Sequence, residues 1–265
     1  MIYIFAVMIL FITNRCNSEC SHCMSCCTAE GIDMTDETLI QAIKFINEIN
    51  PFVVSISGGE PTLHKNIIPI IERLQKELTE IPHIGIRPRL TLITNGTFCK
   101  DNRNLRDKIK HIGISVQITH DDRFYKNSLT NYDLCQIPKL FIIEQHVAHV
   151  LAYGNALQNN LPTSKTRIAP YCFNMRSLVN ISNFDFKQAV QEMEGRMKFC
   201  QWAVKPDGSI ILSEAMGCPA VGTVYDSIPT ITQNIVKLKC KNCIYAKTMV
   251  EKGVVAKDVY QKIFE

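Results

Sequence analysis

The chain has 265 residues, of which 46% are hydrophobic and 20% are charged. This length and composition suit one full α/β domain with a small addition, and they exclude a mini-protein and a mostly disordered chain. The net charge is +4, which is less basic than is typical of a nucleic-acid binder, so charge alone does not indicate a partner.

The chain opens with an apolar segment, Met1–Ile12. No Lys or Arg precedes Arg15, no A-x-A-like cleavage site follows, and the segment is far shorter than the ~20 residues that span a membrane. A parallel strand covered on both faces gives such a continuous apolar run. We therefore predict a buried first strand, no membrane partner and a cytoplasmic protein.

Helical and strand patterns then alternate. Thr35 is suited to cap a helix that has Asp36 and Glu37 in its first turn and apolar residues at helical spacing up to Ile49. The alternation predicts a parallel α/β sheet or barrel. The further predicted helices are 64–78 and 101–110, and the predicted strands are 52–57, 90–94, 112–118, 140–143 and 147–153.

The last third of the chain has a different pattern. Residues 159–170 contain Asn-Asn and two prolines, which favours a linker, and residues 184–197 are predicted to be helical. The sequence Lys205-Pro-Asp-Gly208 predicts a turn that joins strands 201–204 and 209–212 in a β-hairpin. We divide the chain into a barrel domain over 1–158, a linker and helix over 159–197, and a small domain over 198–265.

The chain has twelve cysteines, and most of them fall into one tight group near the start and one spread group near the end, which is the clustering of metal ligands. Cys16, Cys20 and Cys23 follow the first strand in a C-x3-C-x2-C pattern. Three thiolates on one loop can hold three corners of a [4Fe-4S] cluster and leave the fourth iron open. The alternative is a zinc loop, although structural zinc sites usually have four protein ligands on paired C-x2-C knuckles.

The second strand leads into Gly58-Gly59-Glu60-Pro61. Such a sequence alone can be a tight strand-to-helix turn. Together with the cysteine loop it resembles the radical S-adenosylmethionine (SAM) enzymes. The resemblance implies a partial (β/α)6 TIM-like barrel, shortened toward its end. It also implies that the open iron binds the amino and carboxylate groups of SAM and that Gly58, Gly59 and Glu60 lie at its amino group.

The same resemblance assigns further contacts with SAM. His22 stands where the family places a residue against the adenine, and Ser115 and Gln117 lie on the fourth strand, where ribose and carboxylate contacts are expected. Each of these residues also has a packing explanation. The other residues so assigned are Thr94 and Asn95, in a sequence similar to the family's TNG turn, and Tyr153 and Asn155, in a variant of a Gly-Arg-Ala turn in which Asn155 replaces the arginine.

A second set of cysteines lies near the C-terminus. Cys200 and Cys218 flank the predicted hairpin, and Cys240 and Cys243 form a C-x2-C knuckle. Four thiolates can enclose a second [4Fe-4S] cluster, and the set resembles the twitch domain, a shortened SPASM extension. The G-x4-C step typical of SPASM domains is absent, since Ser213 stands at its cysteine position. A zinc knuckle is the alternative.

The remaining cysteines have no ligand spacing. Cys26 and Cys27 follow the first cluster closely, but a fourth cysteine ligand there would block SAM, so we predict that neither is a ligand. We expect Cys99, Cys135 and Cys172 to be small buried hydrophobic residues.

The resemblance implies a reaction and its partners. A reductant such as flavodoxin or ferredoxin supplies an electron, SAM is cleaved to methionine and a 5′-deoxyadenosyl radical, and the radical abstracts a hydrogen atom from the substrate. The substrate stays open between a small polar metabolite, a peptide side chain, and a nucleotide or modified DNA base. We expect residues 119–122, 153–156 and 171–176 to face it. A zinc-stabilised binding module is the non-enzyme alternative.

Overall fold

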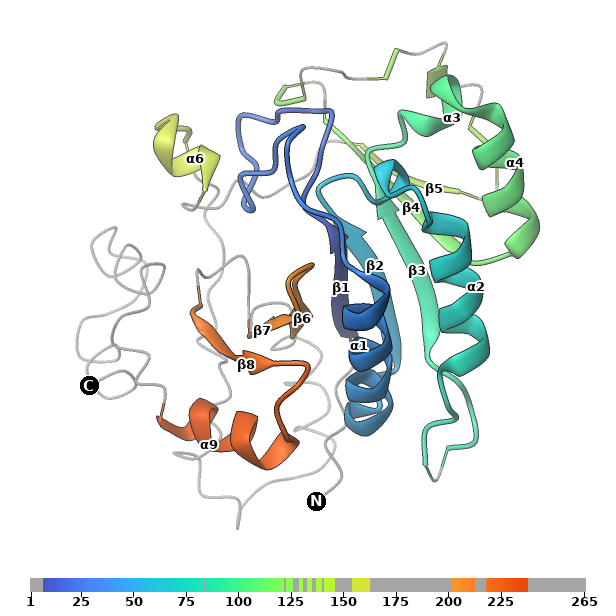
Figure 1. The fold of residues 1–265 in the computed structure, drawn as a ribbon. Helices are drawn as coiled ribbons and strands as arrows, with labels where there is room; N and C mark the ends of the chain where they lie inside the picture. Colours follow the sequence, from blue (N-terminus) through green and yellow to red (C-terminus); the bar gives the residue numbers. More distant parts are fainter. Residues whose placement is uncertain are drawn as a thin grey trace, which may run out of the picture.

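The computed structural model describes residues 7–82, 84–121, 123–125, 129–130, 133–134, 137–139, 141–145, 154–162, 202–212 and 218–237 (Figure 1). Within these ranges the strands form one open eight-stranded sheet in the order β5-β4-β3-β2-β1-β6-β7-β8. The strands are β1 (Val7–Thr13), β2 (Val53–Gly58), β3 (Arg89–Thr94), β4 (Ser115–His120), β5 (Ile142–Gln145), β6 (Ala203–Val204), β7 (Ser209–Ile211) and β8 (Ala220–Thr223).

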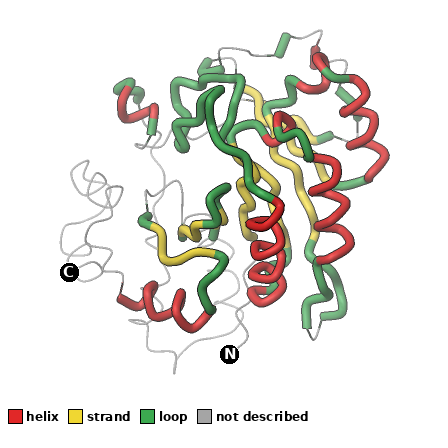
Figure 2. Tube along the Cα trace, in the orientation of Figure 1, coloured by secondary structure: helices red, strands yellow, loops and turns green. Residues whose placement is uncertain are grey.

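Strands β1 to β5 pair in parallel, each with its successor in the chain. The helices α1, α2 and α4 connect them along one side of the sheet, as Figure 2 shows in red. An open, mostly parallel sheet with this connection pattern is consistent with the expected partial barrel. The helical segments are α1 (Asp36–Ile49), the 3₁₀ turn η1 (Pro61–Leu63), α2 (Ile67–Glu77), α3 (Phe98–Asp101), α4 (Arg103–Ile112), α6 (Asn155–Gln158) and α9 (Ile228–Lys237).

The helix-facing side of the sheet is the main core. Alternate residues of the strands, such as Leu10, Ile56 and Leu92, are fully buried against helix residues such as Ile46 and Ile71. Each side chain of this size contributes about 1.5–3 kcal/mol when it is removed from water. The opposite side of the sheet, which we call the inner face, is therefore left for other contacts.

The predicted boundaries are confirmed in part. Thr35 caps α1 as expected, because its hydroxyl accepts a hydrogen bond from the Thr38 amide. The expected helix at residues 64–78 begins only at Ile67, after η1. The expected helix at 101–110 is interrupted at Asn102, whose side chain caps α4 by accepting from the Leu105 amide.

The start of the fourth strand was predicted wrongly. Helix α4 continues to Ile112 and ends at Gly113, which adopts a left-handed conformation with φ 75°, so β4 begins at Ser115. Isoleucines suit a strand and a helix face equally well, so their pattern alone could not place this boundary. Strand β5 lies two residues later than predicted, and the strand expected at 147–153 lies outside the described residues, as does the helix expected at 184–197.

The predicted hairpin is confirmed, and it extends the same sheet. Strands β6 and β7 pair antiparallel across the Lys205–Gly208 turn, and β6 pairs in parallel with β1. Helix α9 packs near β8, and Ile231 of α9 is fully buried in the main core. The described part of the C-terminal region is thus attached to the sheet beside the first strand.

Candidate active site

The loop between β1 and α1 carries the three clustered cysteines at the carboxyl end of the parallel strands. It folds back on itself, because the Cys16 amide donates to the Thr28 carbonyl (2.7 Å) and Thr13 forms a bridge with Asp33. We call residues 14–33 the cysteine loop. The conformation of this loop places Cys16 in a buried position and leaves Cys20 and Cys23 half-buried.

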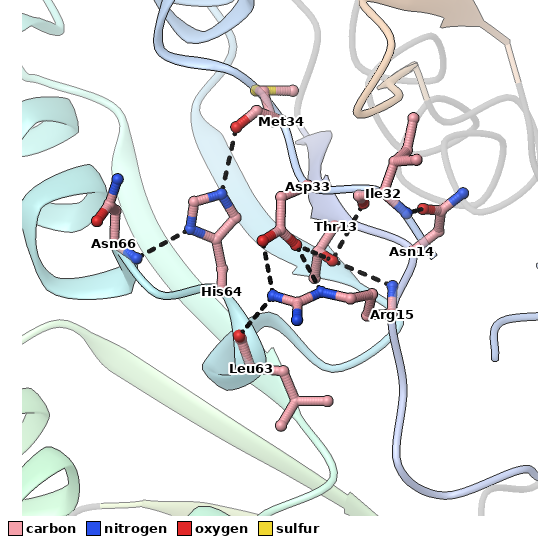
Figure 3. Close-up of polar contacts among 9 residues, drawn as sticks. All are labelled: Thr13, Asn14, Arg15, Ile32, Asp33, Met34, Leu63, His64 and Asn66. Carbon is pink, nitrogen blue, oxygen red and sulfur yellow. Dashed lines mark hydrogen bonds and ion pairs between the residues drawn. The ribbon is translucent and has the colours of Figure 1, made fainter. Parts of the chain in front are cut away.

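An ion pair fixes the base of the cysteine loop (Figure 3). Arg15 donates to both carboxylate oxygens of Asp33, from Nε at 3.0 Å and from Nη2 at 2.6 Å, and Nη2 also donates to the Leu63 carbonyl. The Thr13 hydroxyl donates to the same Asp33 at 2.6 Å. Partial burial opposes ionisation of Asp33, but these hydrogen bonds outweigh it and lower its pKa.

Two glycines at the end of β2, Gly58 and Gly59, hold the base of the cysteine loop in place, and we call them the glycine clamp. The Gly59 amide donates to the Thr13 carbonyl (2.9 Å) and the Glu60 amide to the Arg15 carbonyl (2.7 Å). A Cβ at Gly58 would collide with the Thr13 carbonyl oxygen, and one at Gly59 with the Arg15 carbonyl oxygen. Only glycine permits this close backbone approach.

Glu60 is fully buried, and its side chain joins two strand ends. Its oxygens accept from the Thr62 amide (3.1 Å) and hydroxyl (2.5 Å), from the Thr94 hydroxyl (2.7 Å) and from the Asn95 amide (2.7 Å). Burial raises the pKa of Glu60, while these donors oppose the shift. With four donors, this carboxylate holds the end of β3 next to the end of β2.

Asn95 continues the connection from β3 back to the cysteine loop. Its amide nitrogen donates to Asn17 Oδ1 (2.8 Å) and Ser18 Oγ (2.6 Å), and its oxygen accepts from the amide and hydroxyl of Thr97. Asn17 in turn donates to the Thr97 hydroxyl at 3.0 Å. The segment between Cys16 and Cys20 is therefore fastened to the turn after β3.

An aromatic group packs on the other side of the cysteine loop. The His22 ring stacks on Tyr125, with centroids 5.7 Å apart, and contacts Phe124 at 4.8 Å. Its Nδ1 is buried and has no hydrogen-bond partner in the described structure, and burial lowers the pKa of His22. Nearby, Arg123 donates hydrogen bonds to both carboxylate oxygens of the buried Asp121, from Nε at 2.8 Å and from Nη2 at 2.7 Å.

Helix α6 closes the third side. The Asn155 amide donates to the Cys23 carbonyl (2.9 Å), and its side chain donates to the Cys20 carbonyl (3.1 Å). A Cβ at Gly154 would collide with the carbonyl oxygens of Cys23 and Met24. Asn155 thus lies beside the cysteines, and its side chain binds the loop backbone.

The three cysteines differ in acidity. Burial raises the pKa of Cys16 and of Cys20. A hydrogen bond from the Cys27 thiol is the largest effect on Cys23; burial opposes it, the backbone amides of Ser25, Cys26 and Cys27 also donate, and the pKa falls to about 6. Cys27 therefore lies in contact with Cys23, a contact that its spacing did not indicate.

These thiols suit an iron–sulfur cluster. Thiolates are the ligands that such clusters select, and Cys23 is surrounded by hydrogen-bond donors that favour a thiolate. Among the described residues, no three His, Cys, Asp or Glu side chains lie close enough together to hold a single metal ion. A four-iron cluster takes its thiolates at separate corners and does not need such convergence.

The structure brings most predicted site residues together at this edge. Gln117 lies on the inner face of β4, whereas Ser115 is the first residue of that strand, two residues further from the cysteine loop. Cys218 is half-buried against the main core. Cys200, Cys240, Cys243 and Tyr153 lie outside the described residues.

Sequence reasoning missed several residues that hold the loop. Arg15, Asn17 and Asp33 stand out only once their partners are known, because those partners are distant in sequence: Arg15 and Asp33 are 18 residues apart, and Asn17 and Thr97 are 80 residues apart. Spacing alone gives no signal for Tyr125, which stacks on His22.

Comparisons with known proteins agree with this geometry. Residues 10–137 match the family model described as the Radical SAM superfamily. GTP 3′,8-cyclase of Clostridium perfringens (strain SM101 / Type A) is 24% identical over 185 residues, 68% of this chain and 51% of that protein. GTP 3′,8-cyclase of Alkaliphilus metalliredigens (strain QYMF) is 33% identical over 139 residues, 49% of this chain and 40% of that protein. The chain therefore spans about half of the first relative's length and less of the second.

Solved structures share the fold. The crystal structure of BtrN in complex with AdoMet and 2-DOIA superposes with a TM-score of 0.57 at 14% identity, covering 94% of this chain and 91% of that one. A structure of anSMEcpe with bound AdoMet gives 0.52 at 18% identity, covering 88% and 82%. None of the described helices is long and apolar enough to span a membrane. The cysteine loop, the glycine clamp and the family match together identify residues 10–137 as a radical SAM domain.

Proposed function

We propose that this protein is a radical SAM enzyme that abstracts a hydrogen atom from its substrate. Cys16, Cys20 and Cys23 would hold a [4Fe-4S] cluster whose open iron binds SAM. When bound, the cluster and SAM supply methionine and a 5′-deoxyadenosyl radical once an electron arrives from flavodoxin or ferredoxin. The main support is that the ends of β2 and β3 are hydrogen-bonded onto the loop that carries these thiols.

The chain's own residues would orient SAM beside the cluster. Gly58 and Gly59 leave the backbone free of side chains at the loop, and the His22 ring offers a flat surface for the adenine. Gln117 on the inner face is suited to the ribose or carboxylate. Glu60, Thr94, Asn95 and Asn155 would position the backbone around these contacts, because their side chains are already paired with it or with each other. Tyr153 would join the same rim.

We also propose a second [4Fe-4S] cluster on Cys200, Cys218, Cys240 and Cys243. Its support is the confirmed β6–β7 hairpin, which Cys200 and Cys218 flank in sequence. A fully ligated cluster has no open iron for substrate. Two roles fit it equally: it would relay an electron from a substrate radical, which favours an oxidation, or it would serve the structure alone. Zinc held by the same four thiols is the alternative.

The substrate class is open between a small polar molecule, a peptide side chain and a nucleotide. Two observations bear on it. The two curated relatives described above are named GTP 3′,8-cyclase, which favours a nucleotide. The structural neighbour of similar length, BtrN, was solved with AdoMet and 2-DOIA, which favours a small molecule.

Anaerobic reconstitution tests both clusters. We expect about eight irons per chain, four for each cluster, and a cluster electron paramagnetic resonance (EPR) signal that SAM perturbs. The joint replacement of Cys16, Cys20 and Cys23 by Ala should remove four irons and the response to SAM, and replacement of the four late cysteines should remove the other four.

Activity gives the decisive readout. Reduced enzyme should form 5′-deoxyadenosine from SAM, and the triple variant should form none. If SAM is consumed only by transfer of its methyl or aminocarboxypropyl group, the proposed hydrogen abstraction is wrong. Iron near four per chain with zinc present would assign the late cysteines to zinc.

A further inference from the structure

The inner face of the sheet has a row of three hydroxyl groups below the cysteine loop. Ser55 of β2 pairs with Thr91 of β3, and Thr91 pairs with Ser115 of β4. Residues that pair across neighbouring strands point to the same face of a sheet. The neighbours of these residues along each strand, such as Ile56, Leu92 and Val116, are buried in the helix-side core, so the three hydroxyls face inward.

These hydroxyls are unpaired, and two of them belong to buried residues. Ser55 is 5% exposed and Thr91 is 9% exposed, and Ser115 is half-buried. None of the three side chains has a hydrogen-bond partner in the described part of the chain. Solvent still reaches their oxygens, since the fully buried side-chain nitrogens and oxygens that lack a partner among the described residues are Nδ1 of His22 and Nδ1 of His120. Hydroxyls that face inward, have no protein partner and stay accessible are available to bind a ligand.

The row lies one layer below the surface expected to bind SAM. Ser57 and Gln117 are two residues closer to the cysteine loop, a step of about 7 Å along the strands. Gly58 follows Ser57 and contacts Thr13, the residue just before the cysteine loop, and Gly59 contacts Arg15 of the loop itself, so this upper layer is the one next to the three cysteines. A ligand on Ser55 and Thr91 would therefore sit beyond SAM, within reach of chemistry at its deoxyadenosyl end.

The same face has an apolar half beside the hydroxyl row. Ile9 pairs with Ser55 on one side and with Ala203 on the other, and Ala203 pairs with Ile211. Phe11, Ala203 and Ile211 form a separate buried cluster with Ile9 packed against it. Phe11, Ala203 and Ile211 are already covered by the protein, so Ile9, which is half-buried and pairs directly with Ser55, is the apolar residue of this group that a ligand on the hydroxyl row could contact.

The charges around the row limit the ligand class. The three paired positions are all uncharged, and the cations described on this face lie off the row. Arg89, two residues before Thr91, is exposed at the opposite edge, and Lys205 lies over the Phe11 ring with its Nζ 4.9 Å from the ring centroid. A buried carboxylate or phosphate would need an ionic partner among these positions. Hydroxyls both donate and accept, so they match the hydroxyls of a neutral ring.

From this arrangement we propose that Ser55, Thr91 and Ser115 bind the hydroxyl groups of a neutral hydroxylated ring, such as a sugar, a cyclitol or the ribose of a nucleoside, as the substrate. This rests on the proposed function, because the ring would be the hydrogen donor beside SAM. It reassigns Ser115 from SAM to the substrate layer.

Ligand-observed NMR on the full-length, reconstituted protein tests the proposal directly. The probes are myo-inositol, D-glucose and guanosine, with citrate and a Gly-Ala tetrapeptide as competing classes, each measured with SAM present. Variants Thr91→Val and Ser55→Ala remove one hydroxyl each, whereas Thr91→Ser keeps the hydroxyl and loses only a methyl group. Melting temperatures and the SAM-perturbed EPR signal confirm that each variant is folded and loaded.

We expect saturable binding of at least one ring compound. Thr91→Val and Ser55→Ala should each weaken this binding about 3- to 10-fold, because each variant removes one hydrogen bond to the ring. Thr91→Ser keeps the hydroxyl and should bind the ring as the unchanged protein does. Equal binding by Thr91→Val and Thr91→Ser, no binding of any ring, or preferential binding of citrate or the tetrapeptide would overturn the proposal. So would a loss of the SAM-perturbed signal in these variants, since the row would then serve SAM. If the ring binds but no 5′-deoxyadenosine forms, the proposed radical SAM function is wrong while the proposed ring-binding site still stands.

Discussion

Polar side chains at the carboxyl edge of the sheet are hydrogen-bonded to other residues, whereas the hydroxyls on its inner face are not. At the edge, Glu60 accepts four hydrogen bonds and the Asn95 side chain makes four of its own. On the inner face, Ser55 and Thr91 are almost as buried and have no partner in the described structure. The difference separates groups that build a site from groups that are left to bind a ligand.

The paired polar groups at the carboxyl edge hold the conformation of the cysteine loop. A loop that carries three thiols has few apolar residues to bury, so its conformation depends on backbone contacts and hydrogen bonds. Strand ends β2 and β3, the segment after β4 and helix α6 each supply some of them. The same loop on an isolated peptide would lack these partners.

Gly59→Ala should have the largest effect at the edge. Its Cβ would collide with the Arg15 carbonyl oxygen and lie 3.0 Å from the Cys16 Cβ, so the clamp must open. We expect destabilisation of several kcal/mol and loss of the SAM-binding cluster, measured by denaturant unfolding and iron content.

Gly85→Ala is its control. Gly85 has φ 71° but nothing within 4 Å of an added Cβ, so it carries only the backbone strain of about 1 kcal/mol. If both variants lose the same stability and iron, close approach at Gly59 is not what holds the loop.

Two threonines of β3 allow a comparison within one strand, because Thr94 lies at the carboxyl edge and Thr91 lies on the inner face. Thr94→Val removes a hydroxyl that donates to Glu60 and accepts from the Gly96 amide, and should cost about 1–3 kcal/mol of unfolding free energy. Thr91→Val removes an unpaired hydroxyl and should change stability by less than about 0.5 kcal/mol. Similar losses at the two positions would remove the distinction between edge and inner face.

Asp33→Asn tests the ion pair at the base of the loop. Because the pKa of Asp33 is lowered in the folded state, its carboxylate stabilises the fold above the unfolded pKa of about 3.9 and loses this effect as pH falls through the folded value. Both side chains are partly exposed, so we expect a cost of about 1 kcal/mol at pH 7. Urea unfolding at pH 7 and near pH 3 should show the difference shrink in acid; a constant difference would contradict an ionic origin.

Cys27→Ala should have the smallest effect. The Cys27 thiol donates to Cys23, but Cys27 is not expected to be a ligand, so iron content and the SAM-perturbed EPR signal should be kept. Cys26→Ala, at an exposed position, is the matched control. A loss of four irons in Cys27→Ala alone would make Cys27 a cluster ligand.

Local sequence determined the elements and the thiol loop. The apolar run before Cys16, the cap at Thr35 and the turn at Lys205–Gly208 each act within a few residues, and the structure contains the strand, helix and hairpin that they predict. The C-x3-C-x2-C spacing with Gly58-Gly59-Glu60 indicated a radical SAM domain for the same reason, since both motifs are short and contiguous.

Tertiary structure decided how those motifs are held and what they leave unpaired. Arg15 meets Asp33, Asn95 meets Ser18, and Asn155 meets Cys20 across 18, 77 and 135 residues of sequence. The inner-face row likewise exists only because three strands pair in one register. No local pattern contains these contacts, because each depends on which segments the packed sheet brings side by side.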